Sequence, residues 1–520
     1  GTQEARPNPP NPTKKMAASR APPSTAAADG GIEENAMAIL DSSGIKDSRD
    51  LHDDQAAFLE AVRSACLAAD NPSAPSWRMC NAVFQILRNS SSLELGVASF
   101  HLLMELDKST ALSFSVWGLQ YPRTYLKDSG SGQALVVVSE AWSPFLLRNN
   151  AVCAESGGDE TSSGHLFNPS RFSLLIEDLV EMTNATDVDS RNKAMKNMMS
   201  FQYLINTLEA DFVPRHIAYK ESLDWVIFRE SMLNMLLGSR KMVFKSLVKN
   251  CMYILQNQYH REAEDSIPSE GASAKSASDL DSNLNFSFEL ERTLLSLRKL
   301  FIMVMNLDLI RKQADSSGLT SRADGFRNPV MEVILDELTY NTSYLSPFLS
   351  DKCQIYSQNC NYVETETFLE WKWKLEIILQ YFSKYCGKTA VRTRRSDNSQ
   401  QDLKLESILS FFLTATSAKA IVKKMNSEVA QLLLAHAYQI LLPNSRENNL
   451  KVCLSVQGDS SDMTATTEKI GATLQQISCN LISAFQNLRK VNPNIQISPF
   501  EKEALFTAAT FTRNLKNEES

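Results

Sequence analysis

The stretch from Ser296 to Leu349 constrains the fold of this chain more than any other. Apolar residues recur mostly three and four positions apart in its first half, and further apolar side chains fill the middle turns. These residues are Leu297, Leu300, Phe301, Ile302, Met303, Val304, Met305 and Leu307. A helix that is apolar around most of its circumference is buried on several sides. The sequence therefore predicts a helical core around this segment.

A polar connector from Gln313 to Arg327 separates this helix from a second one. Gly318 and Gly325 suit the turn or left-handed conformations that other residues resist. The pair Asn328 and Pro329 is typical of an N-cap followed by a first-turn proline. One apolar stripe then follows for packing against the first helix, formed by Val330, Val333, Ile334 and Leu338. We interpret the stretch as a helical hairpin, the unit of a helical stack.

Helical patterns of the same kind run from Ile32 to about Leu515. Two of them cover Leu403 to Leu413 and Ala418 to Leu442. We expect a break in the second at Asn426. A short valine-rich segment, Ala134 to Val138, fits a brief strand or a buried turn. Roughly fifteen helices without a fixed period favour an all-α fold, an irregular armadillo- or HEAT-like helical-repeat solenoid.

Several segments do not fit the helical-repeat domain, which we place at residues 32–515. Residues 1–31 are rich in Pro, Ala and Ser and have almost no large apolar side chain, so they predict a disordered tail. We expect further disordered inserts at 153–165, 261–281 and 444–463. The segment 351–370, which contains Cys353 and Cys360, is an atypical insert.

Composition limits the partners of the chain. The net charge is -7 at pH 7, so the molecule as a whole does not attract nucleic acid, and any such contact must come from a local patch. The nine cysteines are scattered and odd in number, which suits reduced thiols. The most apolar run, Leu300 to Ile310, is shorter than the roughly 20 residues of a membrane span. We expect a soluble intracellular protein.

No motif for catalysis, metal binding or cofactor binding is recognised. The six histidines do not occur at metal-ligand spacing, and no Gly-x-Ser-x-Gly elbow is present. Gly387-Lys388-Thr389 ends like a phosphate loop, but Phe382 stands where the first glycine belongs. We therefore predict no catalytic, metal or cofactor residues and a chain that is not an enzyme.

One basic segment deserves a functional hypothesis. We take seven residues as candidate contacts for a DNA phosphate backbone or an acidic partner: Lys388, Arg392, Arg394, Arg395, Lys419, Lys423 and Lys424. The alternatives are a solvated basic edge and a nuclear localisation signal. Aromatic side chains are not interleaved with these cations, so base stacking on single strands is disfavoured.

Several strings resemble, in the same order, a plant family known as "suppressor of npr, inducible". The resemblance runs from about Asn35 to about Thr512. The strings are Ile45-Lys-Asp-Ser-Arg49, Phe58-Leu-Glu-Ala-Val-Arg63, Glu140-Ala-Trp-Ser-Pro-Phe145, Gly318-Leu-Thr-Ser-Arg-Ala-Asp-Gly325, Met331-Glu-Val-Ile-Leu-Asp-Glu-Leu-Thr-Tyr340, Lys372-Trp-Lys-Leu-Glu376 and Val391-Arg-Thr-Arg-Arg395.

The resemblance implies a non-enzymatic, armadillo-like protein of the nucleus that negatively regulates systemic acquired resistance and defence-gene expression. It also implies the counterpart of the Nse six subunit of the structural-maintenance-of-chromosomes (SMC) five/six complex. That complex acts in DNA-damage repair and homologous recombination, and the implied partner is an Nse five-like subunit. An armadillo-type transcriptional repressor or adaptor at defence promoters, independent of the complex, is the alternative.

Overall fold

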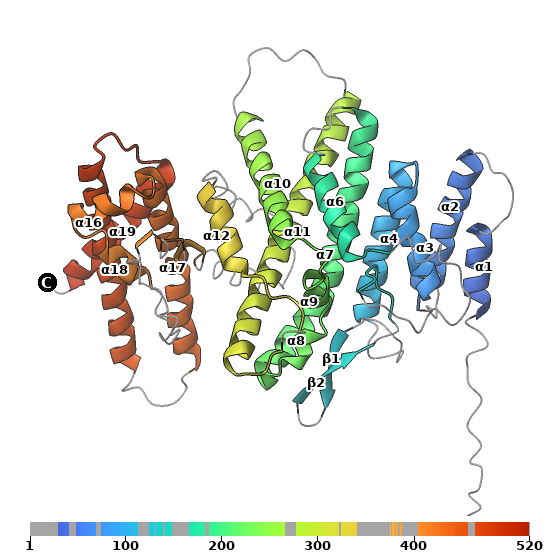
Figure 1. Cartoon of the computed structure of the whole chain (residues 1–520), viewed down its shortest axis with the longest axis horizontal. Coiled ribbons are helices and arrows are strands. Elements are labelled where there is room, and N and C mark those ends of the chain that lie inside the picture. Colours follow the sequence, from blue (N-terminus) through green and yellow to red (C-terminus); the bar gives the residue numbers. More distant parts are fainter. Residues whose placement is uncertain are drawn as a thin grey trace, which may run out of the picture. The chain divides into compact units, whose positions relative to one another are not determined.

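The structure is a computed structural model of the whole chain (Figure 1). It describes residues 30–40, 48–68, 74–112, 124–129, 132–138, 141–147, 166–181, 187–265, 277–321, 324–340, 404–455 and 463–518, together with 375, 377–379, 381–382 and 385–386. The segments 1–29, 153–165 and 351–370 lie outside the described residues. Two compact units are present, Gly1–Tyr121 and Pro122–Ser520. Each is described by itself.

The all-α class with solenoid-like succession of helices is confirmed, with one small hairpin of strands added. In the first unit, each helix packs on near neighbours in sequence. Ser76 caps one of them, since its side chain accepts a hydrogen bond from Met79 N. The helices of this unit are α1 (Gly30–Leu40), α2 (Ser48–Arg63), the π-helical turn η1 (Ser64–Ala68), α3 (Trp77–Asn89) and α4 (Leu93–Leu112).

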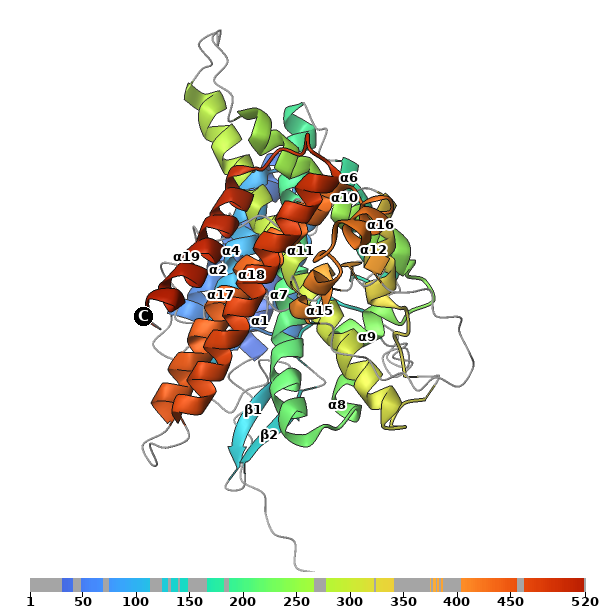
Figure 2. The same ribbon diagram turned by 90° about the vertical axis from the view of Figure 1, so that its left-hand side faces the viewer.

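The middle part of the second unit is organised by two long helices, α7 and α11, which lie side by side in both views (Figures 1 and 2). Leu297 and Leu307 of α11 are fully buried, which confirms the predicted central helix. The helices here are α6 (Pro169–Glu181), α7 (Val188–Ser222), α8 (Val226–Arg229), α9 (Met232–Leu237), α10 (Phe244–Asp265), α11 (Ala277–Ser316) and α12 (Val330–Tyr340).

A two-stranded antiparallel hairpin, β1 (Thr124–Ser129) and β2 (Gly132–Val137), precedes these helices. The strand predicted around Ala134 is confirmed, and its partner strand β1 was not predicted. A buried carboxylate holds the hairpin to α7, because Thr124 Oγ1 donates to Asp211 Oδ1 at 2.6 Å. Asp211 also accepts from Arg215 Nε at 2.9 Å and from Met232 N at 2.8 Å. One side chain of α7 therefore fixes β1 and the start of α9.

The C-terminal part of the second unit is a second group of packed helices. Its long members α17, α18 and α19 lie side by side in both views (Figures 1 and 2). The predicted break at Asn426 is confirmed, since it separates α16 from α17. The helices are α15 (Leu405–Ser410), α16 (Ala415–Val422), α17 (Ser427–Ser455), α18 (Met463–Val491) and α19 (Pro499–Glu518).

Several helices extend further than the sequence predicted. α10 continues to Asp265 and α11 begins at Ala277, so part of the expected insert 261–281 is helical. α17 likewise reaches Ser455 within the expected insert 444–463, and α1 begins at Gly30 within the expected tail. Once a helix is nucleated by its packed turns, each further residue adds a hydrogen bond at little cost, so polar ends continue. Within the described residues, no helix is both long and apolar enough to cross a membrane.

Candidate interaction site

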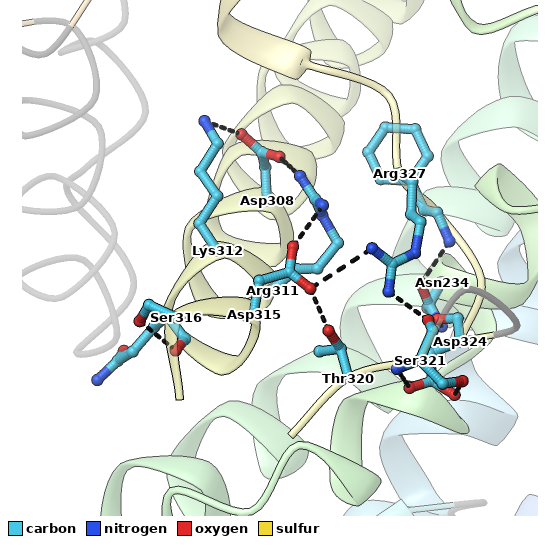
Figure 3. Close-up of polar contacts among 12 residues, drawn as sticks. Asn234, Asp308, Arg311, Lys312, Asp315, Ser316, Thr320, Ser321, Asp324 and Arg327 are labelled. Atoms are coloured by element: carbon cyan, nitrogen blue, oxygen red, sulfur yellow. Dashed lines mark hydrogen bonds and ion pairs between the residues drawn. The ribbon is translucent and has the colours of Figure 1, made fainter. Parts of the chain in front are cut away.

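The connector between α11 and α12 is fastened to α9 by Asn234, a buried side chain (Figure 3). Its Nδ2 donates to Asp324 O at 3.1 Å and to Arg229 O at 3.0 Å. Its Oδ1 accepts from Phe326 N at 3.0 Å. These three hydrogen bonds offset the free-energy cost of burying the Asn234 amide. They also give hydrogen-bond partners to backbone groups of the connector, which is not helical.

Two glycines allow the connector to approach α9 this closely. Gly325 has φ +96, and a Cβ built there would overlap the amide of Asn234. A Cβ on Gly238 would lie 2.7 Å from the carbonyl carbon of Gly325, so the two backbones touch. Gly318 has φ +70 and open space around it. The turn or left-handed conformations expected of Gly318 and Gly325 are both confirmed. At Gly325 the close contact with Asn234 is a second reason why a residue without a Cβ is needed.

A charged network covers the end of α11 and the start of the connector (Figure 3). Asp308 accepts from Arg311 and from Lys312, each at 2.7 Å. Asp315 accepts from Arg311 at 2.9 Å and from Thr320, and it pairs with Arg327 at 3.5 Å. Because Asp308 and Arg311 are nearly buried, each needs its opposite charge. The network therefore holds the connector in one shape.

Asp324, which is half-buried within the connector, completes this arrangement. The backbone N–H of Ser321 is the main reason that the pKa of Asp324 lies below its ordinary value of 3.8. Burial is the next largest effect and raises the pKa, whereas the Ser321 hydroxyl, the Trp225 side chain and the charge of Arg229 lower it by smaller amounts. The carboxylate is thus ionised at neutral pH. Taken together, these contacts fix the described residues of the connector.

The seven predicted basic contacts divide into two sets. Lys388, Arg392, Arg394 and Arg395 lie outside the described residues. The other three are exposed at the C-terminal end of α16, where the helix dipole favours cations: Lys419, Lys423 and Lys424. Burial raises the pKa of Cys386 to about 11, and the charge of Lys424 acts in the opposite direction.

The structure adds two apolar residues that the sequence did not single out. Phe411 and Leu413 are 38% and 40% exposed, on either side of the buried Phe412. Asn487 Nδ2 of α18 donates to Phe412 O at 2.9 Å and fixes this junction between α15 and α16. The predicted helix from Leu403 to Leu413 ends at Ser410, so the sequence pattern had placed these side chains on a helix.

We call the resulting patch the α15–α16 surface: Phe411, Leu413, Lys419, Lys423 and Lys424. Exposed aromatic and aliphatic side chains supply binding energy in protein interfaces, and surrounding charges select the partner and speed its encounter. The patch thus suits a protein partner with an apolar side chain and an acidic rim.

Among the residues that the structure describes, no cluster of three or more His, Cys, Asp and Glu could hold a metal ion.

The fold and these surfaces define an all-α, solenoid-like helical protein with hydrogen-bonded polar connections and an exposed surface that is partly apolar and partly basic. Comparison with known proteins narrows this class. The family model described as SNI1 middle domain matches residues 122–354, and the one described as SNI1 C-terminal domain matches residues 386–516. The chain belongs to the SNI1 family.

One curated relative is similar over nearly the whole chain. It is the Arabidopsis thaliana protein named "Negative regulator of systemic acquired resistance SNI1", 36% identical over 482 residues. The match covers 92% of this chain and 94% of the relative. No solved structure was found to match. The family resemblance read from the sequence strings is confirmed.

Proposed function

We propose that this chain is a negative regulator of systemic acquired resistance and acts as a non-enzymatic helical scaffold subunit of the SMC five/six complex. The observation that carries the first part is membership of the SNI1 family, with a relative of that name aligned over 92% of the chain. The second part follows from what the sequence resemblance implies. In this role the protein works in the nucleus, in DNA-damage repair and homologous recombination.

The partner in this proposal is an Nse five-like subunit, and the α15–α16 surface is where it docks. Phe411 and Leu413 supply an apolar anchor of the kind that dominates interface energies. Lys419, Lys423 and Lys424 are exposed on and after the next helix, α16, and their positive charge favours an acidic partner surface. The bond from Asn487 to Phe412 O keeps the anchor in position before binding.

The test is a tagged pull-down from nuclease-treated plant nuclei, read by mass spectrometry. We expect the wild-type chain to recover the SMC five/six subunits together with an Nse five-like protein. The double variant Phe411→Ser, Leu413→Ser should weaken recovery by roughly thirtyfold, since losing an anchor costs about 2 kcal/mol. The matched control is Phe506→Ser, which removes an exposed apolar side chain from α19 of the same helical group.

The outcomes separate the two parts of the proposal. Recovery of the complex by wild type and by the double variant alike would contradict the docking surface and leave the scaffold role in place. Recovery of transcription factors without any SMC subunit would contradict the scaffold role and favour an adaptor at defence promoters. Purified wild-type protein that fails to bind the Nse five-like subunit at micromolar concentration would contradict the partner.

A further inference from the structure

We propose that the N-terminal end of α10 binds the phosphate backbone of double-stranded DNA. The contact residues are four cations at the turn before the helix and in its first turns, which we call the α10 basic surface: Arg240, Lys241, Lys245 and Lys249. This surface belongs to the middle part of the chain and is separate from the docking surface proposed above. Its DNA binding is a property of the isolated chain and does not depend on the proposed assembly.

The positive charge of the α10 basic surface is not neutralised by neighbours. All four side chains are exposed. No Asp or Glu occurs between Ser231 and Asn257, although the whole chain has seven more acidic than basic residues. Two helices packed against α10 have exposed carboxylates, Glu177 and Glu181 on α6 and Glu332 and Asp336 on α12. Within the described part of the chain, none of the four cations forms an ion pair with these or any other carboxylates.

The spacing of the cations along α10 and the helix dipole suit the binding of a polyanion. Lys245 and Lys249 are one helical turn apart on the exposed face of α10, about 6 Å along the axis. Phe244, Leu247 and Val248 are buried on the opposite side. The positive end of the helix dipole lies at the same place and adds to the attraction for phosphate oxygens. A row of cations along one face can follow successive phosphates.

The start of α10 is held rigidly, so the cations are arranged before binding. The ring of Phe244 packs against Phe326 of the connector with centroids 4.8 Å apart. Ser173 of α6 donates to the sulfur of Met242 at 3.2 Å. Because Asn234 fixes Phe326 in turn, the fastened connector of Figure 3 supports the base of this surface. Such preorganisation reduces the entropy lost on binding.

The composition of the surface favours duplex DNA over other anionic partners. Residues 231–257 are all described, and Val243, 66% exposed, is the single exposed large apolar side chain among them. A membrane-surface helix or a protein interface would present an apolar face or aromatic anchors here. Single strands need exposed aromatic rings for stacking, and Phe244 is buried. The surface therefore offers mainly positive charge, which binds the phosphate groups of a duplex independently of the base sequence.

The experiment measures fluorescence anisotropy of a labelled random-sequence duplex with the full-length chain over a range of salt concentrations. The test variant is Lys241→Glu, Lys245→Glu, Lys249→Glu. The matched control is Lys108→Glu, Lys193→Glu, Lys502→Glu, which changes the net charge by the same amount at exposed lysines of three other helices, α4, α7 and α19. We expect the test variant to bind at least about tenfold more weakly and to lose about 2 from the slope of log affinity against log salt.

Equal losses in the two triple variants would overturn the proposal, because net charge and not this surface would then account for binding. A wild-type chain that prefers phosphatidylserine vesicles or polyglutamate to the duplex, with that preference lost in the test variant, would overturn it in favour of a membrane or an acidic protein. Circular dichroism melts of both variants verify folding. If the test variant unfolds, the milder Lys245→Gln, Lys249→Gln pair must still lower the salt slope.

Discussion

The middle and C-terminal helical groups of the second unit are held together by different interactions. In the middle group, Asp211 and Arg215 are 1% and 3% exposed, and they are joined by a direct ion pair. In the C-terminal group, α17 buries a row of small and aliphatic residues and makes its polar contacts through neutral side chains of its own, such as Tyr438 with Ser478 at 2.8 Å and Gln431 with the Glu501 carboxylate at 3.1 Å. Buried charges tolerate the loss of a partner poorly, whereas apolar packing tolerates small polar changes.

The two groups also differ in which side chains they expose. The α10 basic surface has charge with a single exposed valine, and the α15–α16 surface combines charge with an exposed aromatic ring. Both are basic, but only the second has the apolar anchor that a protein interface needs. The sign of the charge alone therefore does not identify the partner. The predictions below test whether the internal contrast between the two groups is real.

The largest effect is expected from Asp211→Ala. The substitution leaves Arg215 buried without its carboxylate and removes acceptors from Thr124 and Met232, so it should cost about 3–5 kcal/mol. Hydrogen exchange read by mass spectrometry should show lost protection in β1, α8 and α9. Protection in α17 to α19 should not change. A uniform loss over both groups would contradict the local role of this carboxylate.

The next effect comes from a matched pair of glycines in the connector. Gly325→Ala requires a strained φ and a clash with Asn234, and should cost about 3 kcal/mol. Gly318→Ala meets open space and should cost only the strain of its positive φ, about 1 kcal/mol. Urea unfolding of the two variants measures the difference. Equal losses would mean that the contact with Asn234 contributes nothing.

A smaller effect is expected in the C-terminal group from Tyr438→Phe. Ser478 keeps its hydrogen bond to Leu474 O when the Tyr438 hydroxyl is removed, so no polar group loses all its partners. The cost should be about 1 kcal/mol, measured by urea unfolding as for the glycine pair. A loss as large as that of Asp211→Ala would erase the contrast between the two groups.

The smallest effect concerns acid. Since the pKa of Asp324 is lower in the folded chain than its ordinary 3.8, its contribution to stability is complete above that value. The contribution is lost as the pH falls below 3.8 through the folded pKa, because the unfolded chain then binds more protons. We expect Asp324→Asn to flatten the acid limb of a plot of melting temperature against pH. An unchanged acid limb would show that the Ser321 contact does not stabilise the connector.

Local features of this fold were predictable because they depend on neighbours in sequence. The buried face around Leu297, the positive φ of Gly318 and the helix break at Asn426 all follow from residue types within one or two turns. The sequence also singled out Lys419, Lys423 and Lys424 as candidate contacts for phosphate or an acidic partner, and these side chains are exposed. The α10 basic surface had a signal as well, a long stretch without Asp or Glu, and it was missed because its cations are spread over ten residues.

The sequence by itself determined the all-α class, the family and the residues that begin and end several helices. Only the tertiary structure decided that Asp211 meets Thr124, 87 positions away, and that Asn234 binds Phe326, 92 positions away. It also decided that Phe411 and Leu413 are exposed while Phe412 is buried. Helical periodicity is set by hydrogen bonds four residues apart, but the burial of a side chain depends on which distant helix covers it.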